Sequence, residues 1–314
     1  SGPNAAAWLD RILANRLPAV GKATLAHHLT AGGGVQAEYM VAGLGEDSFY
    51  LVSTPRAERW NFDDLSKLLP ADGSVSLKNV TNERGCFTIV GPKARDVLQP
   101  LTEIDLSNAG FPWFGVKTGS VALASDVRLL RVNYEGELGW ELYHPMAYQR
   151  QLLDAILGEG EKHGMRLVGL HALESLRLEK SYRAMYRDMN PELNALESGL
   201  ERFIRLDKGD FVGRDAILKY KDKNDQRRSV TLKIETDGAS TLASEGLYID
   251  SKLVGRITSG GYGYTLGHDV ALALLPERHS TPGTKLDVAI LGEWKTATVI
   301  ADSPYDPSST RARM

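Results

Sequence analysis

The chain has few of the residues and motifs that usually mark an active site. Its single cysteine, Cys86, excludes an internal disulfide and a cysteine-rich zinc site. It has no His-Glu-x-x-His motif and no Gly-x-Ser-x-Gly turn, and the adjacent His27 and His28 would diverge in a regular element. We therefore expect no metal site. A dispersed Ser/His/Asp triad stays open, because its members meet only in the fold.

The sequence also lacks a long apolar run and a strong excess of one charge. No segment approaches the roughly 18 apolar residues needed to span a bilayer, and the first residues lack the layout of a signal peptide. The net charge is -3 and the pI is near 6.2, which gives no general attraction to nucleic acid or to an anionic membrane. We expect a small-molecule partner, no nucleic acid, no membrane, and a cytoplasmic location, or the mitochondrial matrix in a eukaryote.

The 314 residues are 42% hydrophobic, which is enough for more than one packed core. Strand-like segments precede helical ones, which predicts an α+β arrangement. The expected strands form two pairs, 35–41 with 48–52 and 74–80 with 85–90, and the expected helices are 58–69, 148–156 and 170–182. Short strands broken by glycine follow residue 229 and predict a small β-barrel or sandwich. We expect one region at residues 1–222 and a β-barrel domain at 223–314.

Residues 127–143 are typical of a β-hairpin. Apolar and polar residues alternate from Val127 to Tyr134, and Glu135-Gly-Glu137 is expected to form the turn. The return strand has one apolar face, which consists of Leu138, Trp140 and Leu142. The hairpin is therefore expected to pack one face against a core.

Glu141 must lie on the opposite face of that strand, beside Gly139. A glycine inside a strand often marks the close approach of another group, and a flat ligand would satisfy this. A carboxylate fixed on a strand can accept two parallel hydrogen bonds from an amidine-like edge. The alternative is that Glu141 faces water, as most acidic residues do, and the pattern leaves both hypotheses open.

A second polar group precedes Gly91-Pro92. It consists of Asn79, Asn82 and Glu83, and it indicates either a polar turn or part of a binding site. Cys86 follows in an apolar, strand-like run, so we expect it to be a buried structural thiol.

Taken together, several motifs resemble the tetrahydrofolate-binding aminomethyltransferase family, which includes the T-protein of the glycine cleavage system. They are Tyr134-Glu-Gly-Glu-Leu-Gly-Trp-Glu141, Leu176-Arg-Leu-Glu179, Leu196-Glu-Ser-Gly-Leu200, Asp210-Phe-Val-Gly-Arg-Asp-Ala216 and Thr258-Ser-Gly260. The stretches 176–183 and 304–311 are most similar to the C-terminal folate domain of dimethylglycine oxidase, dimethylglycine dehydrogenase and sarcosine dehydrogenase. The order and spacing of the set make it specific.

The resemblance implies subdomains around a central folate channel, the last one a β-barrel. It also implies that Glu141 accepts hydrogen bonds from the pterin ring and that Tyr134 lines the same pocket. The family reaction moves a one-carbon unit from an N-methylated amine or its iminium, such as dimethylglycine or sarcosine, onto tetrahydrofolate. The expected product is 5,10-methylenetetrahydrofolate, and positioning of the reactants does much of the work.

The chain departs from the family pattern at two places. T-protein-like members carry an aspartate a few residues before the Gly-Pro, where this chain has Asn82 and Glu83, and we take these two as the catalytic candidates. An asparagine can orient a ligand but cannot act as a base. The amine-oxidising relatives also place a flavin domain upstream, so we expect FAD only in an upstream domain or a partner, and this chain to be a fragment of a longer protein.

Two alternatives stay open within the resemblance. One is a non-catalytic folate-binding module, although relatives of that kind carry a cysteine where this chain has Lys208-Gly-Asp-Phe211. The other is a tetrahydrofolate-dependent O- or S-demethylase, which would make 5-methyltetrahydrofolate.

Overall fold

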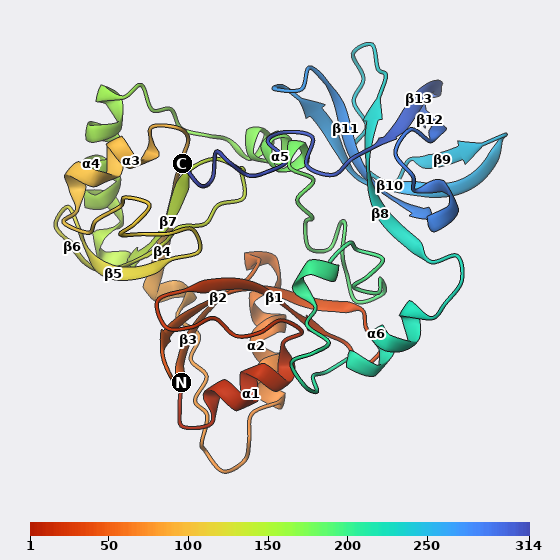
Figure 1. Cartoon of the computed structure of the whole chain (residues 1–314). Coiled ribbons are helices and arrows are strands. Elements are labelled where there is room, and N and C mark those ends of the chain that lie inside the picture. Colours follow the sequence, from red (N-terminus) through yellow and green to blue (C-terminus); the bar gives the residue numbers. More distant parts are fainter.

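The computed structural model describes all residues from Ser1 to Met314 and shows three units arranged around a centre (Figure 1). The first unit is a three-stranded antiparallel sheet of order β1-β2-β3 with two helices. Its elements are α1 (Ala5–Ile12), β1 (Ala23–Leu29), β2 (Val35–Gly45), β3 (Ser48–Val52) and α2 (Glu58–Lys67). The helices cover one face of this sheet, where Leu9 and Leu65 pack on Tyr39 and Val41.

The second unit is a four-stranded antiparallel sheet of order β4-β7-β6-β5. Its elements are β4 (Arg84–Val90), α3 (Ala94–Leu98), β5 (Val116–Val121), β6 (Ala124–Leu130), β7 (Gly139–Pro145) and α4 (Gln149–Lys162). One face packs on α3 and α4 around Trp140 and Leu142. The other face meets the first sheet, because Ala42 of β2 shares a core with Leu130 and Tyr143. The two sheets therefore turn their inner faces toward each other.

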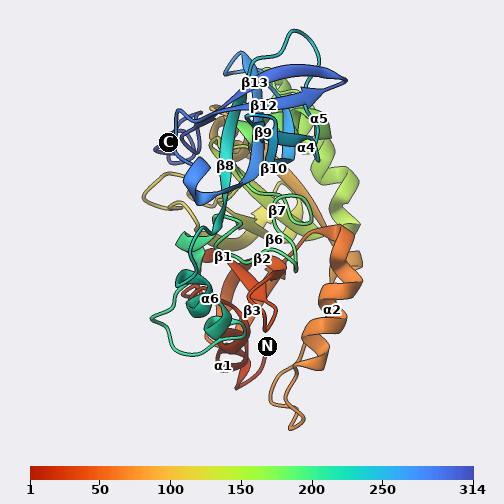
Figure 2. The same cartoon turned by 90° about the vertical axis from the view of Figure 1, so that its right-hand side faces the viewer.

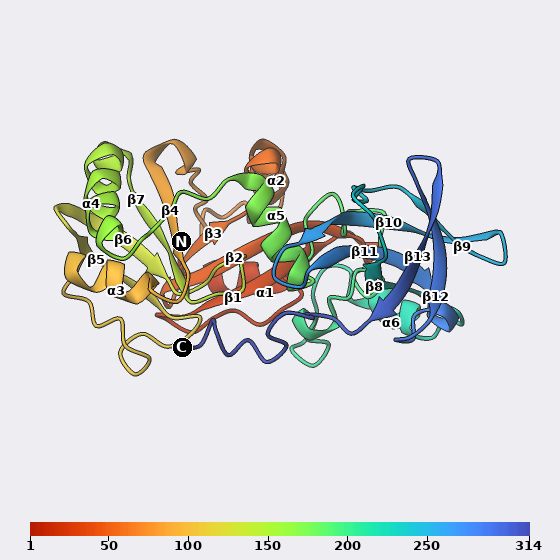
Figure 3. The same cartoon turned by 90° about the horizontal axis from the view of Figure 1, so that it is seen from above.

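The third unit is a closed six-stranded barrel of order β10-β11-β8-β13-β12-β9. Its strands are β8 (Arg227–Ile234), β9 (Gly246–Ile249), β10 (Lys252–Gly263), β11 (His268–Pro276), β12 (Lys285–Ile290) and β13 (Glu293–Ile300). Helix α5 (Leu170–Glu179) lies between the barrel and the second unit, and α6 (Arg214–Lys221) leads into β8 (Figures 1 and 3). The expected division between residues 222 and 223 falls in the connection from α6 to β8.

The α+β class with a C-terminal barrel is confirmed, and two local predictions are corrected. The hairpin connection spans residues 131–138 instead of 135–137, because the side chain of Asn133 accepts hydrogen bonds from the backbone of Glu135 and Gly136 and makes a wider loop. Residues 74–80 do not pair with β4, whose neighbour is β7 alone. No helix has both the length and the apolar composition needed to cross a membrane.

The residues after β13, 301–314, form a strap that returns from the barrel to the second unit (Figure 1). The buried Lys180 donates hydrogen bonds to the carbonyls of Tyr305 and Asp306. The buried Arg131 donates to the carbonyls of Phe111 and Met314. Both cations therefore hold the strap through its backbone carbonyl groups.

A buried ion pair joins α5 to the barrel. The side chains of Arg177 and Asp188 are fully buried, with 3.0 Å between Nη1 and Oδ2. Asp188 also accepts hydrogen bonds from the Ala184 amide and from the hydroxyls of Thr258 and Ser259 on β10. The carboxylate therefore has a partner on every side.

We expect Asp188→Ala to destabilise the protein by about 3–5 kcal/mol, because it leaves the Arg177 charge buried and unpaired. Urea unfolding gives the free energy. The matched control is Asp154→Ala, which removes the exposed ion pair with Arg150 and is expected to change stability little. Equal small losses in both variants would contradict the role assigned to Asp188.

Candidate functional site

Glu141 lies on the inner face of the second sheet. It is paired with Thr88 on β4 and with Leu130 on β6. As the alternation predicts, the buried Trp140 and Leu142 point to the opposite face. Glu141 is therefore directed toward the space between the two sheets, away from the helices that cover the outer face.

The strand beside Glu141 leaves this inner face partly uncovered. Cys86 and Thr88 of β4 are both exposed, so the expectation that Cys86 is buried was wrong. The reason is that β4 is an edge strand, and its inner side chains have no layer above them. The packing of the protein itself requires a glycine at position 139, so a nearby ligand is not needed to explain it. A Cβ at this position would lie 2.7 Å from the carbonyl oxygen of Ile89.

Burial raises the pKa of Glu141 to about 7, although a hydrogen bond from Tyr143 opposes the shift. The Tyr143 hydroxyl donates to Oε2 over 2.5 Å, and no protein donor bonds Oε1. Burial, together with the Glu141 charge, also raises the pKa of Tyr143. The site thus holds a carboxylate with one free oxygen in surroundings that disfavour its charge.

Tyr134 lies in the loop that connects the end of β6 to the start of β7, close in sequence to Glu141. Its hydroxyl donates to the Arg183 carbonyl over 2.7 Å, and its ring stacks on Tyr182 with centroids 5.9 Å apart. Burial raises the pKa of Tyr134. Because the hydroxyl is already bonded, the tyrosine offers a ring face and not a proton donor.

Sequence analysis missed a second carboxylate, Glu38 on β2. It is paired with His27 of β1, so both side chains lie on the same face of the first sheet. That face is the inner one, because Ala42, four residues further along β2, packs with Leu130. The pattern gave no signal, because β1 was not predicted and its pairing with β2 could not be read from spacing.

The His27 ring is fully buried, and its Nε2 lies 2.9 Å from Oε2 of Glu38, which is 25% exposed. The histidine fixes the carboxylate, while the Glu38 charge is near enough to Tyr134 to help raise the pKa of that phenol. His28 turns to the other face, where Asp64 lies 3.2 Å away. The side chains of the two adjacent histidines therefore lie on opposite faces of the sheet.

Asn82 and Glu83 do not join this site. Both are exposed in the short 3-10 turn Thr81–Glu83, and Glu83 forms an ion pair with Lys78 over 2.8 Å. Glu83 is five positions before Thr88, the partner of Glu141, which corresponds to roughly 16 Å along a strand. The structure thus places Glu38 near Tyr134 and Glu141 on the inner face of the second sheet, and it leaves Asn82 and Glu83 in an exposed turn.

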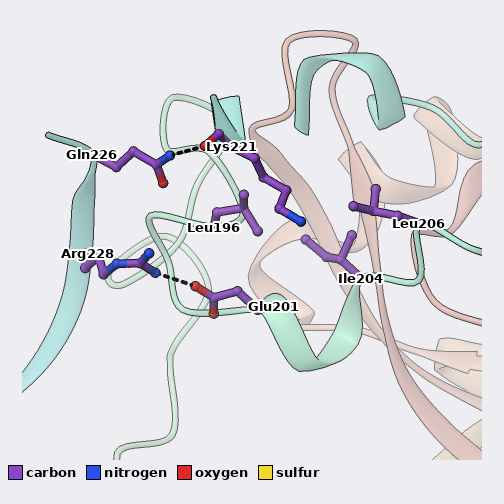
Figure 4. A pocket seen from close by; sticks show the side chains of 7 residues that line it. All are labelled: Leu196, Glu201, Ile204, Leu206, Lys221, Gln226 and Arg228. Atoms are coloured by element: carbon purple, nitrogen blue, oxygen red, sulfur yellow. Dashed lines mark hydrogen bonds and ion pairs between the residues drawn. The ribbon is translucent and has the colours of Figure 1, made fainter. Parts of the chain in front are cut away.

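A separate hollow of about 230 Å³ lies where the chain enters the barrel (Figure 4). Three of its four polar side chains already have partners, since Arg228 pairs with Glu201 and Gln226 donates to the Lys221 carbonyl. The rest of its lining consists of Leu196, Ile204 and Leu206. We therefore assign this hollow to the packing of the connection and not to the site.

The comparisons with known proteins cover the whole chain. Residues 1–208 match the family model of the GCVT N-terminal domain, and residues 227–306 match that of the glycine cleavage T-protein C-terminal barrel domain. The chain is 36% identical to the mitochondrial dimethylglycine dehydrogenase of Homo sapiens, over 100% of this chain and 36% of that protein. It is 30% identical to an aminomethyltransferase of Desulfitobacterium hafniense, over 97% of this chain and 82% of that protein.

Two further facts qualify these matches. The chain spans only 36% or 37% of the length of the dimethylglycine dehydrogenases it matches. The crystal structure of the glycine cleavage system aminomethyltransferase T from Bartonella henselae has the same fold, with a TM-score of 0.85, 24% identity, and coverage of 98% of this chain and 82% of that chain.

The raised pKa of Glu141 makes stability depend on pH. Because the pKa rises from 4.5 for a solvent-exposed glutamate to about 7 in the folded chain, the folded state binds more protons between these values. The free energy of unfolding therefore falls as pH rises through this window, by roughly 1–3 kcal/mol from this residue. Urea unfolding at pH 4 to 8 gives the free energy of unfolding of the wild type and of Glu141→Gln, which cannot titrate. The difference between the two free energies at each pH is the contribution of Glu141. A difference that stays constant with pH would mean that the carboxylate is well solvated.

Proposed function

The chain belongs to the glycine cleavage T-protein family, and from this premise we propose that it binds tetrahydrofolate between its two sheets and transfers a one-carbon unit to it. The observation that carries the proposal is the free Oε1 of Glu141 on an inner sheet face. A half-buried carboxylate oxygen that no protein group donates to fits a ligand that presents N–H groups. The pterin ring of folate presents such an edge.

In this proposal Glu141 orients the pterin, and Tyr134 packs against the ligand. The Tyr143 hydroxyl holds one oxygen of Glu141, which leaves the other for the ring edge. Tyr134 offers its ring because its hydroxyl is bonded to the Arg183 carbonyl. Bound tetrahydrofolate would supply the nitrogen that accepts the one-carbon unit. The protein supplies position and excludes water.

A second carboxylate would handle a proton or stabilise positive charge at the transferring nitrogen. The geometry favours Glu38 for this role, because it lies on the inner face and His27 fixes its orientation. The candidates from the sequence, Glu83 and Asn82, would need to act from an exposed turn. We therefore propose Glu38 as the acting carboxylate, with His27 as its positioning residue, and the kinetic test below separates the two assignments.

The donor we propose is a small N-methylated amine or its iminium, of the dimethylglycine or sarcosine kind, and the product is 5,10-methylenetetrahydrofolate. The names of two relatives, dimethylglycine dehydrogenase and sarcosine dehydrogenase, support this choice. Oxidation of the amine would belong to a flavin-dependent domain or subunit that holds FAD outside these 314 residues. Product analysis separates this proposal from a demethylase, which would release 5-methyltetrahydrofolate.

We expect Glu141→Ala to weaken tetrahydrofolate binding by about 1.5–3 kcal/mol, the usual loss for hydrogen bonds to a charged group. Isothermal calorimetry measures the affinity directly. Glu103→Ala, which changes an exposed carboxylate on the second unit, is the control and should bind like the wild type. Unchanged affinity in Glu141→Ala would contradict the proposal and support the alternative that Glu141 faces only water.

We expect Glu38→Gln to lower the rate of one-carbon transfer by about 100-fold, because an amide cannot take up the proton, while tetrahydrofolate affinity stays within about twofold. Single-turnover kinetics with the flavin-dependent partner, the N-methylated amine and tetrahydrofolate supplies the rate. Glu83→Gln is the matched variant and should retain the wild-type rate. The reverse pattern, a slow Glu83→Gln and a normal Glu38→Gln, would establish the assignment made from the sequence.

A further inference from the structure

The outer surface of the barrel carries an apolar strip that lies far from the proposed folate site. It consists of Leu253 on β10, Tyr248 on β9, Trp294 on β13 and Leu291 in the turn between β12 and β13. Leu253, Trp294 and Leu291 are 67%, 62% and 89% exposed. Strand β9 lies at the end of the barrel away from the other two units (Figures 1 and 3). Figure 2 looks onto this end of the molecule, and no other element of the chain covers the strip.

Strand pairing makes the apolar strip continuous. Tyr248 is directly opposite Leu253 on β10, and its ring lies 5.2 Å from that of Trp294, edge to face. Trp294 is opposite Ala289, so its ring crosses a small residue to reach β9. Leu247, the neighbour of Tyr248 along β9, is buried in the barrel core. The strip is therefore on the solvent side of the sheet, and a contiguous exposed apolar surface of this kind is typical of a protein interface.

Two opposite charges flank the apolar strip, and neither has a partner. Arg256 on β10 is opposite Gly246, and Asp287 on β12 is opposite Tyr248. Both side chains are exposed, and neither takes part in an ion pair or a side-chain hydrogen bond. Two strand spacings and a step of two residues separate them, so their Cα atoms are about 12 Å apart. The two charges therefore stay separate within one copy.

This pattern of charges and apolar side chains is complementary to itself. In an isologous dimer the same face of two copies meets about a two-fold axis. An axis that crosses β9 midway between the two charges, at right angles to the line that joins them, places Arg256 of each copy opposite Asp287 of the other. The same axis places Leu253 of each copy beside Tyr248 of the other. A second copy thus supplies a partner for both charges and for the apolar strip, whereas a partner of one charge sign would leave one charge unpaired.

We propose that two copies of this chain associate through this face of their barrels, with the apolar strip at the centre and two Arg256–Asp287 pairs beside it. The face spans four strands and about five residues of each, roughly 15 by 15 Å, which is smaller than a standard interface. The dimer is therefore weak and reversible. It leaves the space between the two sheets of each copy open, because β9 lies at the far end of the barrel (Figure 1). The proposal goes beyond the proposed function and does not depend on folate binding.

Sedimentation velocity of the 314-residue chain tests the proposal. From about 1 to 500 µM we expect a shift from monomer to dimer, with a dissociation constant of roughly 100 µM, as for a small transient interface. Trp294→Ala should raise the dissociation constant at least tenfold, because it removes the largest side chain of the contact. The exposed Trp60 on α2 provides the matched control, and Trp60→Ala should associate like the wild type.

Charge reversal makes the test specific to a two-fold contact. Arg256→Asp alone, or Asp287→Arg alone, should raise the dissociation constant at least tenfold, because each charge then meets one of the same sign. An equimolar mixture of these two variants should recover the dimer, since every facing pair again has opposite signs. Lys233→Asp makes the same change of charge on β8, at the opposite side of the barrel, and should leave association unchanged.

Three results would overturn the proposal. The first is a chain that remains monomeric at every concentration. The second is a dimer whose dissociation constant neither charge reversal alters, or that the mixture of the two variants does not restore. The third concerns another occupant, the flavin-dependent unit. If the chain alone stays monomeric and Trp294 becomes shielded from acrylamide quenching only when that unit is added, the face belongs to the flavin-dependent unit and not to a second copy.

Discussion

The buried Arg177–Asp188 pair is the interaction on which the arrangement of the three units depends. Asp188 accepts hydrogen bonds from α5, from its own loop and from β10, so it fixes the barrel relative to the helix between the units. The same segment supplies the Arg183 carbonyl that holds the Tyr134 hydroxyl. The ion pair is near enough to Tyr134 to influence the pKa of its phenol, and through this segment it sets the position of a ring that we place in the proposed site. Such a pair contributes more to fixing one arrangement than to net stability, because desolvation offsets much of its attraction.

The composition of the inner faces of the two sheets explains why we place the proposed site between them. Ala42, Leu130 and Tyr143 close part of the contact as an ordinary apolar core. Each sheet also carries a carboxylate on this face, Glu38 on one and Glu141 on the other. Burying either carboxylate against the other sheet without a donor would cost several kcal/mol. Apolar and polar side chains are therefore neighbours on these faces, which is the composition expected of a small-molecule site.

The sequence predicted features that depend on local periodicity and missed those that depend on pairing between distant strands. Alternation along 138–143 was sufficient to place Trp140 and Glu141 on opposite faces, because a strand has a period of two whatever lies beside it. The partnership of His27 and Glu38 needed the register of β1 on β2, which no spacing encodes. Glu83 was chosen by its offset from Gly91-Pro92, and such an offset gives a distance along the chain but not a direction in the fold. Residues 74–80 had the composition of a strand, yet the structure leaves them outside every sheet, with Ser74 and Ser76 hydrogen-bonded to the backbone of Asn4 and Ser1.

The electrostatics of Glu141 connect stability to selectivity. In the free protein, burial favours the protonated acid, so the ionised form carries a cost that the fold must bear near neutral pH. A ligand that donates two hydrogen bonds reverses this preference, because each bond stabilises the charged carboxylate more than the neutral one. A ligand without donors leaves the cost in place, and one that presents acceptors adds repulsion to it. The burial that destabilises the ionised site therefore also makes the site discriminate among flat ligands by their hydrogen-bond edge, which an exposed carboxylate in water could not do.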